Sequence, residues 1–124
     1  MKNILIVDDE EEVRALLQDK LRKSGYGVMA VKGGEDALEA CKVFSPDLIL
    51  LDIAMPDMNG YQACNELREH KKTKKVPVLF LTGKDLDSRA IEERCGSLGA
   101  AGYLSKTSSL KEILDKIEEV LNKR

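Results

Sequence analysis

The sequence predicts a three-layer α/β sandwich built around a five-stranded parallel sheet with five helices. Five short apolar runs alternate along the chain with longer segments of helical period. The runs are rich in Val, Ile and Leu without polar alternation, which is typical of strands buried on both faces. Regular alternation of strand and helix gives parallel strands joined by right-handed crossovers. The chain has no linker-like, low-complexity or repeated segment, so we expect one domain over residues 1–124.

The strands are predicted where the apolar runs lie. In chain order they are Ile4–Val7, Val28–Val31, Leu48–Leu51, Val78–Leu81 and Gly102–Leu104. The fifth run is short, and it is predicted from its place in the alternation.

The first helix is predicted from apolar residues at helical spacing. These are Val13, Leu16, Leu17 and Leu21. Asp9 is the expected N-cap, and Glu12 three residues later matches a capping box.

The other four helices follow from the same periodicity. The second has the apolar face Ala37, Leu38, Cys41 and Phe44 and ends before Pro46. The third and fourth have the faces Tyr61, Cys64 and Leu67, and Ile91, Cys95 and Leu98. The fifth has the longest stripe: Leu110, Ile113, Leu114, Ile117, Val120 and Leu121. Ser109 and Glu112 form a capping box before this stripe.

Composition excludes several classes of protein. Of 124 residues, 43% are apolar and 34% charged, as in ordinary globular proteins, and a net charge of −2 favours neither a nucleic-acid nor an anionic membrane partner. No apolar run approaches the roughly 18 residues of a membrane span. Three widely spaced cysteines without a Cys-x-x-Cys pair indicate a reducing, cytoplasmic setting. The basic run 70–75 is interpreted as a solvated loop.

Polar residues follow four of the predicted strands. Asp8 and Asp9 end the first, Asp52 ends the third, Thr82 ends the fourth, and Lys106 comes shortly after the fifth. Each residue alone has an ordinary structural explanation, as a helix cap, a strand end or a solvated charge. Because the carboxyl ends of parallel strands meet at one edge, we expect all five to converge there, where such sheets bind ligands.

Three carboxylates at one edge favour a hard divalent cation. Clustered acids raise each other's pKa and cost stability without a cation, and oxygen ligands suit Mg²⁺. We expect Asp9 and Asp52 to be metal ligands, with Asp8 binding directly or through a water. The backbone carbonyl of Ala54 would complete the set.

The same edge suits phosphoryl transfer to an aspartate. This chemistry needs positioning and charge neutralisation more than covalent help, and a carboxylate can accept the phosphoryl group. Asp52 is the expected acceptor because it ends the most buried run. Lys106 and the Thr82 hydroxyl would each contact a phosphoryl oxygen. Gly83 would let the phosphate approach the backbone.

Four separated motifs closely resemble the receiver domain of bacterial two-component response regulators. They are ILIVDDE over Ile4–Glu10, LILLDIAMPDMNG over Leu48–Gly60, LTG over Leu81–Gly83, and GAAGYLSK over Gly99–Lys106. The resemblance covers essentially the whole chain. It implies a flavodoxin-like strand order of 2-1-3-4-5.

The resemblance also implies a function. A histidine kinase or phosphotransfer protein would donate a phosphoryl group to Asp52 in a Mg²⁺-dependent reaction. Thr82 and Tyr103 would then switch position, and a protein partner or fused output domain would read the change. The domain would be a signalling module with slow self-dephosphorylation, not an enzyme with an external substrate, and would bind neither nucleic acid nor membrane directly.

The sequence departs from the family pattern at two places. Thr107 follows Lys106 where the family has a proline in a cis peptide, and a non-proline cis bond costs about 3–4 kcal/mol. We therefore expect a trans bond and a changed direction for the Lys106 side chain. The segment from Thr82 to Lys106 is also longer than usual, which predicts an altered fourth helix near residues 84–96.

Three other interpretations compete with a phospho-acceptor switch. A phosphatase with an aspartyl-phosphate intermediate needs a second acid two residues after the nucleophile, where this chain has Ala54. A flavin-binding redox protein needs a phosphate loop after the first strand, and residues 8–12 are all acidic. A scaffold without the switch is opposed by the complete set of Asp8, Asp9, Asp52, Thr82 and Lys106.

Overall fold

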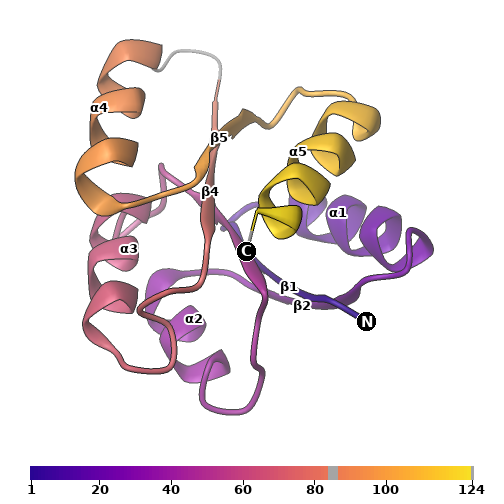
Figure 1. Ribbon diagram of the computed structural model, residues 1–124, viewed down its shortest axis with the longest axis horizontal. Coiled ribbons are helices and arrows are strands. Elements are labelled where there is room, and N and C mark those ends of the chain that lie inside the picture. The colour runs from indigo at the N-terminus through magenta and orange to yellow at the C-terminus, as the bar shows by residue number, and fades with distance from the viewer. Residues whose placement is uncertain (84–86, 124) are drawn as a thin grey trace.

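The computed structural model describes residues 1–83 and 87–123 and contains one five-stranded parallel sheet (Figure 1). The strands are β1 (Asn3–Val7), β2 (Gly27–Val31), β3 (Leu48–Asp52), β4 (Val78–Thr82) and β5 (Gly102–Ser105). The helices are α1 (Glu11–Lys23), α2 (Gly34–Ala40), α3 (Gly60–Glu69), α4 (Ser88–Leu98) and α5 (Leu110–Asn122). The strand order is β2-β1-β3-β4-β5, so the predicted fold is confirmed.

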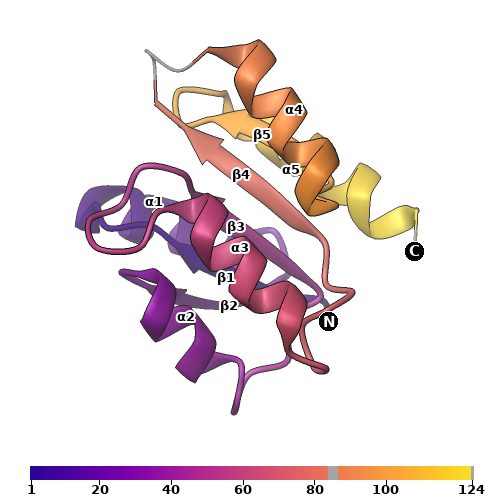
Figure 2. The same cartoon turned by 90° about the vertical axis from the view of Figure 1, so that its left-hand side faces the viewer.

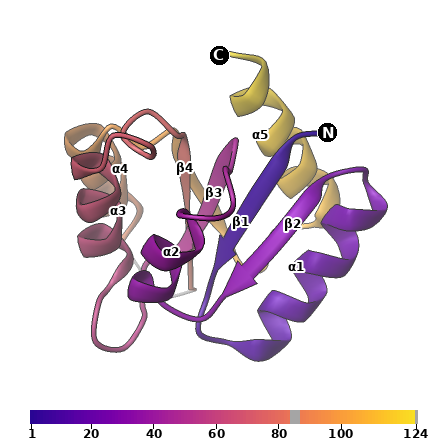
Figure 3. The same cartoon turned by 90° about the horizontal axis from the view of Figure 1, so that it is seen from below.

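The helices form two layers around the sheet. Helices α1 and α5 cover one face, and α2, α3 and α4 cover the other (Figures 1 and 3). Alternate residues of each central strand therefore enter different cores: Leu5 and Ile49 face α2 and α3, while Ile4 and Leu48 face α1 and α5. No helix among the described residues has the length and apolar character needed to cross a membrane.

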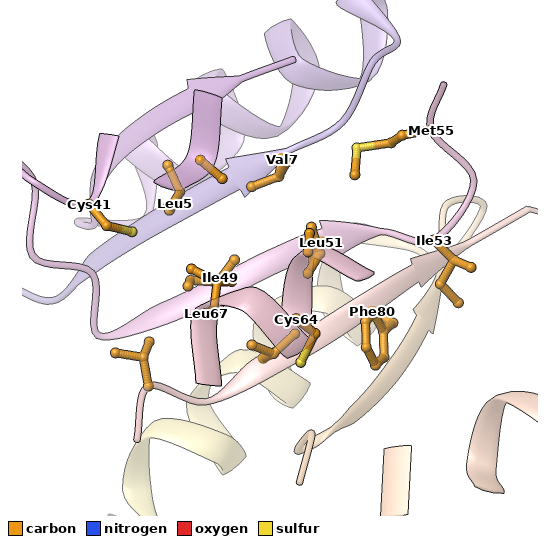
Figure 4. Close-up of a cluster of buried hydrophobic side chains, with 14 of the residues drawn as sticks. Leu5, Val7, Cys41, Ile49, Leu51, Ile53, Met55, Cys64, Leu67 and Phe80 are labelled. Carbon is orange, nitrogen blue, oxygen red and sulfur yellow. The ribbon is translucent and has the colours of Figure 1, made fainter. Parts of the chain in front are cut away.

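The larger core lies between the sheet and helices α2 to α4. Its side chains come from β1, β3 and β4 and from the inner faces of the helices, as the close-up in Figure 4 shows. Phe80 is fully buried and packs edge-on against the ring of Tyr61, with 5.2 Å between centroids. Cys64 of α3 lies in the same core and is a free thiol. Helix α3 lies in front of β3 in Figure 2 and packs on this strand.

The outer strands are less buried than predicted. Every residue of β1, β3 and β4 except Asn3 is buried, but β2 is half-buried along its length and β5 buries only Leu104. The expectation of burial on both faces was wrong for these two strands, because they form the edges of the sheet and lack a neighbouring strand on one side.

Helix α1 differs from its prediction in two respects. Leu17 and Leu21 are buried, but Leu16 is 58% exposed. The N-cap is Glu10 rather than Asp9, and no side chain caps the helix, so the predicted capping box is absent. The physical reason is that the Asp8 carboxylate already accepts the Glu10 N–H, at 2.8 Å.

The remaining helices follow their predicted faces in part, since Leu110 at the start of α5 is exposed and the last two residues of the second predicted face lie beyond α2. Helix α2 ends at Ala40, well before Pro46, and Phe44 packs on the core from the loop beyond it. The predicted capping box of Ser109 and Glu112 on α5 is confirmed. A second box, of Asn59 and Gln62, starts α3 and was not predicted. Helix α4 is regular over Ser88–Leu98, while the start of the long segment at 84–86 lies outside the described residues.

Candidate functional site

The carboxyl edge of the sheet gathers the acids that the sequence places after separate strands. Asp8 and Asp9 follow β1, and Asp52 is the last residue of β3. One carboxylate oxygen from each of these residues and from Glu10 lies within 4.8 Å of the others. The predicted convergence of Asp8, Asp9 and Asp52 is therefore present in the structure, with Glu10 as a fourth acid.

Asp52 is held in place from both of its carboxylate oxygens. The residue is 1% exposed, Oδ1 accepts the Ala54 N–H at 3.1 Å, and Oδ2 accepts from Lys106 Nζ at 3.0 Å. The start of α3 lies directly behind it, since the Gly60 N–H donates to the Ile53 carbonyl at 2.8 Å. A Cβ at residue 60 would collide with the Asp52 carbonyl oxygen and Ile53 Cα, so only glycine fits there.

Asp8 is fully buried beside Asp52. Its backbone N–H extends the β1–β2 pairing by donating to the Val31 carbonyl at 3.1 Å. Arg14 Nη1 donates to the Asp8 carbonyl at 2.8 Å from the first turns of α1. The Asp8 Oδ2 atom lies 3.0 Å from Lys106 Nζ but has no aligned hydrogen bond among the described groups. A buried, incompletely bonded carboxylate oxygen is a position where a cation would be stabilising.

Lys106 is the cation that balances this cluster. Its backbone N–H donates to the Thr82 carbonyl at 2.9 Å, which continues the β4–β5 pairing past Ser105. Its Nζ lies 3.0 Å from both Asp8 Oδ2 and Asp52 Oδ2, and 2.5 Å from Glu10 Oε1. The described residues contain no cis peptide bond, so the Lys106–Thr107 bond is trans as expected. The expected change in direction of Lys106 was wrong, because the trans loop still delivers Nζ to Asp52.

Burial sets the protonation of the site. Desolvation raises the pKa of Asp52 from 3.8 to about 7; the Asp8 charge adds to this rise and the Lys106 ammonium opposes it. Desolvation likewise raises the pKa of Asp8, against its hydrogen bond from the Glu10 N–H and the nearby ammonium. Burial alone would lower the pKa of Lys106, but Glu10, Asp8 and Asp52 together raise it. Three carboxylates therefore share the single positive charge of Lys106.

This donor set fits a small divalent cation. Carboxylate oxygens are the ligands that Mg²⁺ prefers, and it binds through a few of them while keeping several waters. Asp8 Oδ2 is buried without an aligned donor, and one oxygen from each of the four acids lies within a 4.8 Å cluster. A cation at this point would neutralise the charge that burial makes costly.

The other predicted residues lie at the same edge or beside it. Thr82 is the last residue of β4, one position beyond the β4 partner of Asp52, and is buried. Gly83 follows it, is exposed, and has nothing within 4 Å of the position of a Cβ. Ala54 is exposed two residues after Asp52. Tyr103 is half-buried in β5, with its hydroxyl donating to Glu92 of α4 at 3.3 Å.

Known proteins share both this order of motifs and this fold. Residues 4–118 match the family model described as the response regulator receiver domain. The chain belongs to this family. The receiver domain is the module of two-component response regulators that signals in a phosphorylation-dependent way.

Individual relatives agree with the family assignment. The receiver domain is 38% identical to the alkaline phosphatase synthesis transcriptional regulatory protein PhoP of Bacillus subtilis, over 98% of this chain and 49% of that protein. It is 36% identical to a probable transcriptional regulator of Cyanidium caldarium, over 98% of this chain and 47% of that protein. The chain thus spans about half the length of these curated relatives.

Solved structures match the receiver domain over nearly its whole length. The chemotaxis protein CheY4 of Vibrio cholerae has a TM-score of 0.90 at 27% identity, covering 97% of this chain and 98% of that one. The receiver domain of a sensor histidine kinase from Pseudomonas aeruginosa has a TM-score of 0.85 at 28% identity, covering 98% of each chain. That structure is described with a magnesium ion coordinated in the active-site cleft.

Sequence reasoning missed two residues of this receiver domain's site. Glu10 was considered only as one of the acidic residues 8–12, yet its side chain contacts Lys106, 96 residues away. Arg14 was not considered, although it lies one helical turn after Glu10 and holds the Asp8 backbone. The spacing of four between them is the one local signal that places both at the same end of α1.

Proposed function

We propose that this receiver domain, as one unit over residues 1–124, accepts a phosphoryl group on Asp52 in a Mg²⁺-dependent reaction. The observation that carries the proposal is the position of Asp52 at the buried end of the central strand β3. There its Oδ2 lies 3.0 Å from Lys106 Nζ and within the four-acid cluster. A histidine kinase or phosphotransfer protein of a two-component system is the proposed donor.

The transfer uses several of the chain's own groups, each with a different role. A carboxylate oxygen of Asp52 forms a bond to phosphorus, the bond from phosphorus to the donor atom breaks, and the electron pair leaves with the donor. The Ala54 N–H keeps the Asp52 carboxylate oriented through Oδ1. The Lys106 ammonium is already beside Oδ2 and would stabilise the charge on a phosphoryl oxygen. The Thr82 hydroxyl would contact another oxygen, and the exposed Gly83 would let the group approach the backbone.

Magnesium is the proposed cofactor. Asp8, Asp9, Asp52 and the carbonyl of Ala54 would be its protein ligands. When bound, Mg²⁺ supplies charge neutralisation for both the acids and the phosphoryl oxygens. The magnesium ion described in the Pseudomonas aeruginosa receiver supports this choice.

The phosphorylated domain would then act by changing its surface. Thr82 and Tyr103 are the proposed switch residues, since Tyr103 lies on β5 with its hydroxyl on α4. A protein partner or a fused output domain would read the change. The relatives cited above are named as transcriptional regulators and are about twice as long as this chain. The domain is proposed to work in the cytoplasm without direct nucleic-acid or membrane binding. Its only proposed hydrolytic reaction is the slow loss of the phosphoryl group from its own Asp52.

The proposal is tested by chemical phosphorylation. The protein incubated with Mg²⁺ and acetyl phosphate should gain the mass of one phosphoryl group, measured on the intact protein. Asp52→Asn should abolish the gain, whereas Asp57→Asn, which changes a nearby carboxylate outside the cluster, should not. Labelling that persists in Asp52→Asn would show that the acceptor is another residue. Equal labelling in the presence of EDTA would show that the reaction does not require a metal ion.

A further inference from the structure

Glu10 makes a contact that the proposed chemistry leaves unexplained. Its carboxylate lies 2.5 Å from Lys106 Nζ, closer than Asp8 or Asp52. The Glu10 side chain is 58% exposed, whereas the Lys106 side chain is only 14% exposed. An exposed acid therefore reaches inward to the one cation of the cluster.

This contact takes up one of the donors of the lysine. An ammonium group has three N–H donors. The carboxylates around Lys106 are those of Glu10 and Asp52, to which it donates hydrogen bonds, and that of Asp8, whose Oδ2 lies 3.0 Å from Nζ. Two of these belong to residues proposed to bind the metal or the phosphoryl group. Glu10 has neither role, and Lys106 is the only partner of its side chain among the described residues.

A phosphoryl group on Asp52 would need a donor from Lys106. The new group carries negative charge and would lie on the side of Asp52 that faces Nζ. Glu10 would then share the same ammonium with a second anion at short range, and like charges close to one cation repel each other. The phosphorylated state would gain if Glu10 released the lysine.

We propose that Glu10 is a positioning residue that acts through Lys106 as a brake on phosphorylation of Asp52. In the unphosphorylated domain its carboxylate occupies one donor of Lys106. That donor becomes fully available to the phosphoryl group only when Glu10 turns away into solvent. This inference rests on the proposed function, and it concerns the rate and lifetime of the acyl phosphate rather than its existence.

The next two acids in the chain allow the effect of the Glu10–Lys106 contact to be distinguished from the effect of negative charge in general. Glu11 and Glu12 are exposed in the first turn of α1 and make no contact with Lys106. Neutralising either one changes the net charge as much as neutralising Glu10 does. If Glu10 acted only through its long-range field, all three would have similar effects.

The experiment compares Glu10→Gln with Glu11→Gln at saturating Mg²⁺ and a range of acetyl phosphate concentrations. Glu10→Gln should be phosphorylated about two- to fivefold faster than Glu11→Gln, the size expected for losing one ion pair with an exposed partner. Its acyl phosphate should also decay more slowly by a similar factor. A structural defect would not increase the rate and the lifetime together. Saturation is established by a separate Mg²⁺ titration of each variant.

A third variant tests the reach of the side chain. Glu10→Asp keeps the charge but shortens the side chain by one methylene, so it should resemble Glu10→Gln. If Glu10→Asp behaves as the wild type while Glu10→Gln is fast, charge alone acts and the contact mechanism is overturned. If Glu10→Gln is equal to or slower than Glu11→Gln, the brake is overturned, and slower labelling would make Glu10 a metal ligand. Failure of the wild type to label at all would instead refute the proposed function.

Discussion

The two ends of the sheet use charged side chains in opposite ways. Before β4 and β5, at the amino edge, Arg68 of α3 donates hydrogen bonds to backbone carbonyls only. Its partners, at 2.9–3.3 Å, are Thr73, Val76, Leu98 and Gly99. At the carboxyl edge, Asp8 and Asp52 are buried and share the single ammonium of Lys106 with Glu10.

The difference separates an end that stabilises the fold from the end where we propose that the chemistry takes place. Arg68 is a cation whose donors are satisfied by fixed carbonyls, so it ties α3 to the loops before two strands and stabilises them. The acids at the other edge exceed their counter-charge, and their raised pKa values mean that the folded state disfavours their ionised form. The uncompensated acids therefore lower stability at the edge where we propose that a cation binds.

The largest effect is expected from breaking the amino edge. Arg68→Ala should lower the free energy of unfolding by about 2–4 kcal/mol, because it leaves several carbonyls without donors. Arg68→Lys should recover less than half of the loss, since one ammonium cannot span four carbonyls. Urea unfolding measures both. Arg89→Ala, an exposed arginine of α4 whose side chain has no described partner, is the control and should stay within about 0.5 kcal/mol. A loss below that level in Arg68→Ala would remove the contrast between the two edges.

Supplying the missing charge should strengthen the carboxyl edge. Mg²⁺ at 100 times its Kd should stabilise the folded domain by about 2.7 kcal/mol if it binds only the native state. The rise in Tm is measured by scanning calorimetry, and EDTA should reverse it. Asp9→Ala should abolish the rise, whereas Glu11→Ala should retain it. An undiminished rise in Asp9→Ala would place the metal elsewhere.

Removing one buried charge should sharpen the contrast without a metal. Asp52 has a native pKa of about 7 against 3.8 when unfolded, so between these values the native state binds more protons and stability falls as pH rises. Asp52→Asn should therefore be more stable than the wild type by about 1–2 kcal/mol at pH 7.5 in EDTA, and its stability should fall less between pH 4 and 7. Urea melts across this range measure both. Glu35→Gln, outside the cluster, should change neither, and a destabilised Asp52→Asn would contradict the origin of the pKa shift.

The smallest effect concerns the backbone beside the acids. Asp57, in the loop between β3 and α3, has a φ of 66°, in the left-handed region that a Cβ disfavours. Asp57→Ala should be less stable than Asp57→Gly by about 1 kcal/mol, because glycine adopts this conformation without strain. Thermal melts of the two variants provide the comparison. Equal stability would show that this loop relaxes its backbone at no cost.

Much of the fold could be predicted because its signals are local. Each strand lies within one residue of its predicted bounds at either end, since a continuous apolar run is a property of a few adjacent residues. The capping box of Ser109 and Glu112 was predictable for the same reason. The burial of Leu16 was predicted wrongly because helical periodicity identifies the apolar face of α1 but not how much of that face the neighbouring helix α5 covers. Half-burial of β2 and β5 depended on their edge positions, which local composition does not encode.

The candidate site divides along the same line. The sequence by itself determined which residues end the strands, and parallel topology is enough to bring Asp8, Asp9 and Asp52 to one edge. Only the tertiary structure decided the partners of Lys106, including Glu10 at a separation of 96 residues, and the carbonyls that Arg68 reaches in Leu98 and Gly99. The alternation of strand and helix along the chain is carried by repeated local patterns. The pairing of long side chains instead depends on the path of loops and the register of distant strands, and both emerge only when the layers pack together.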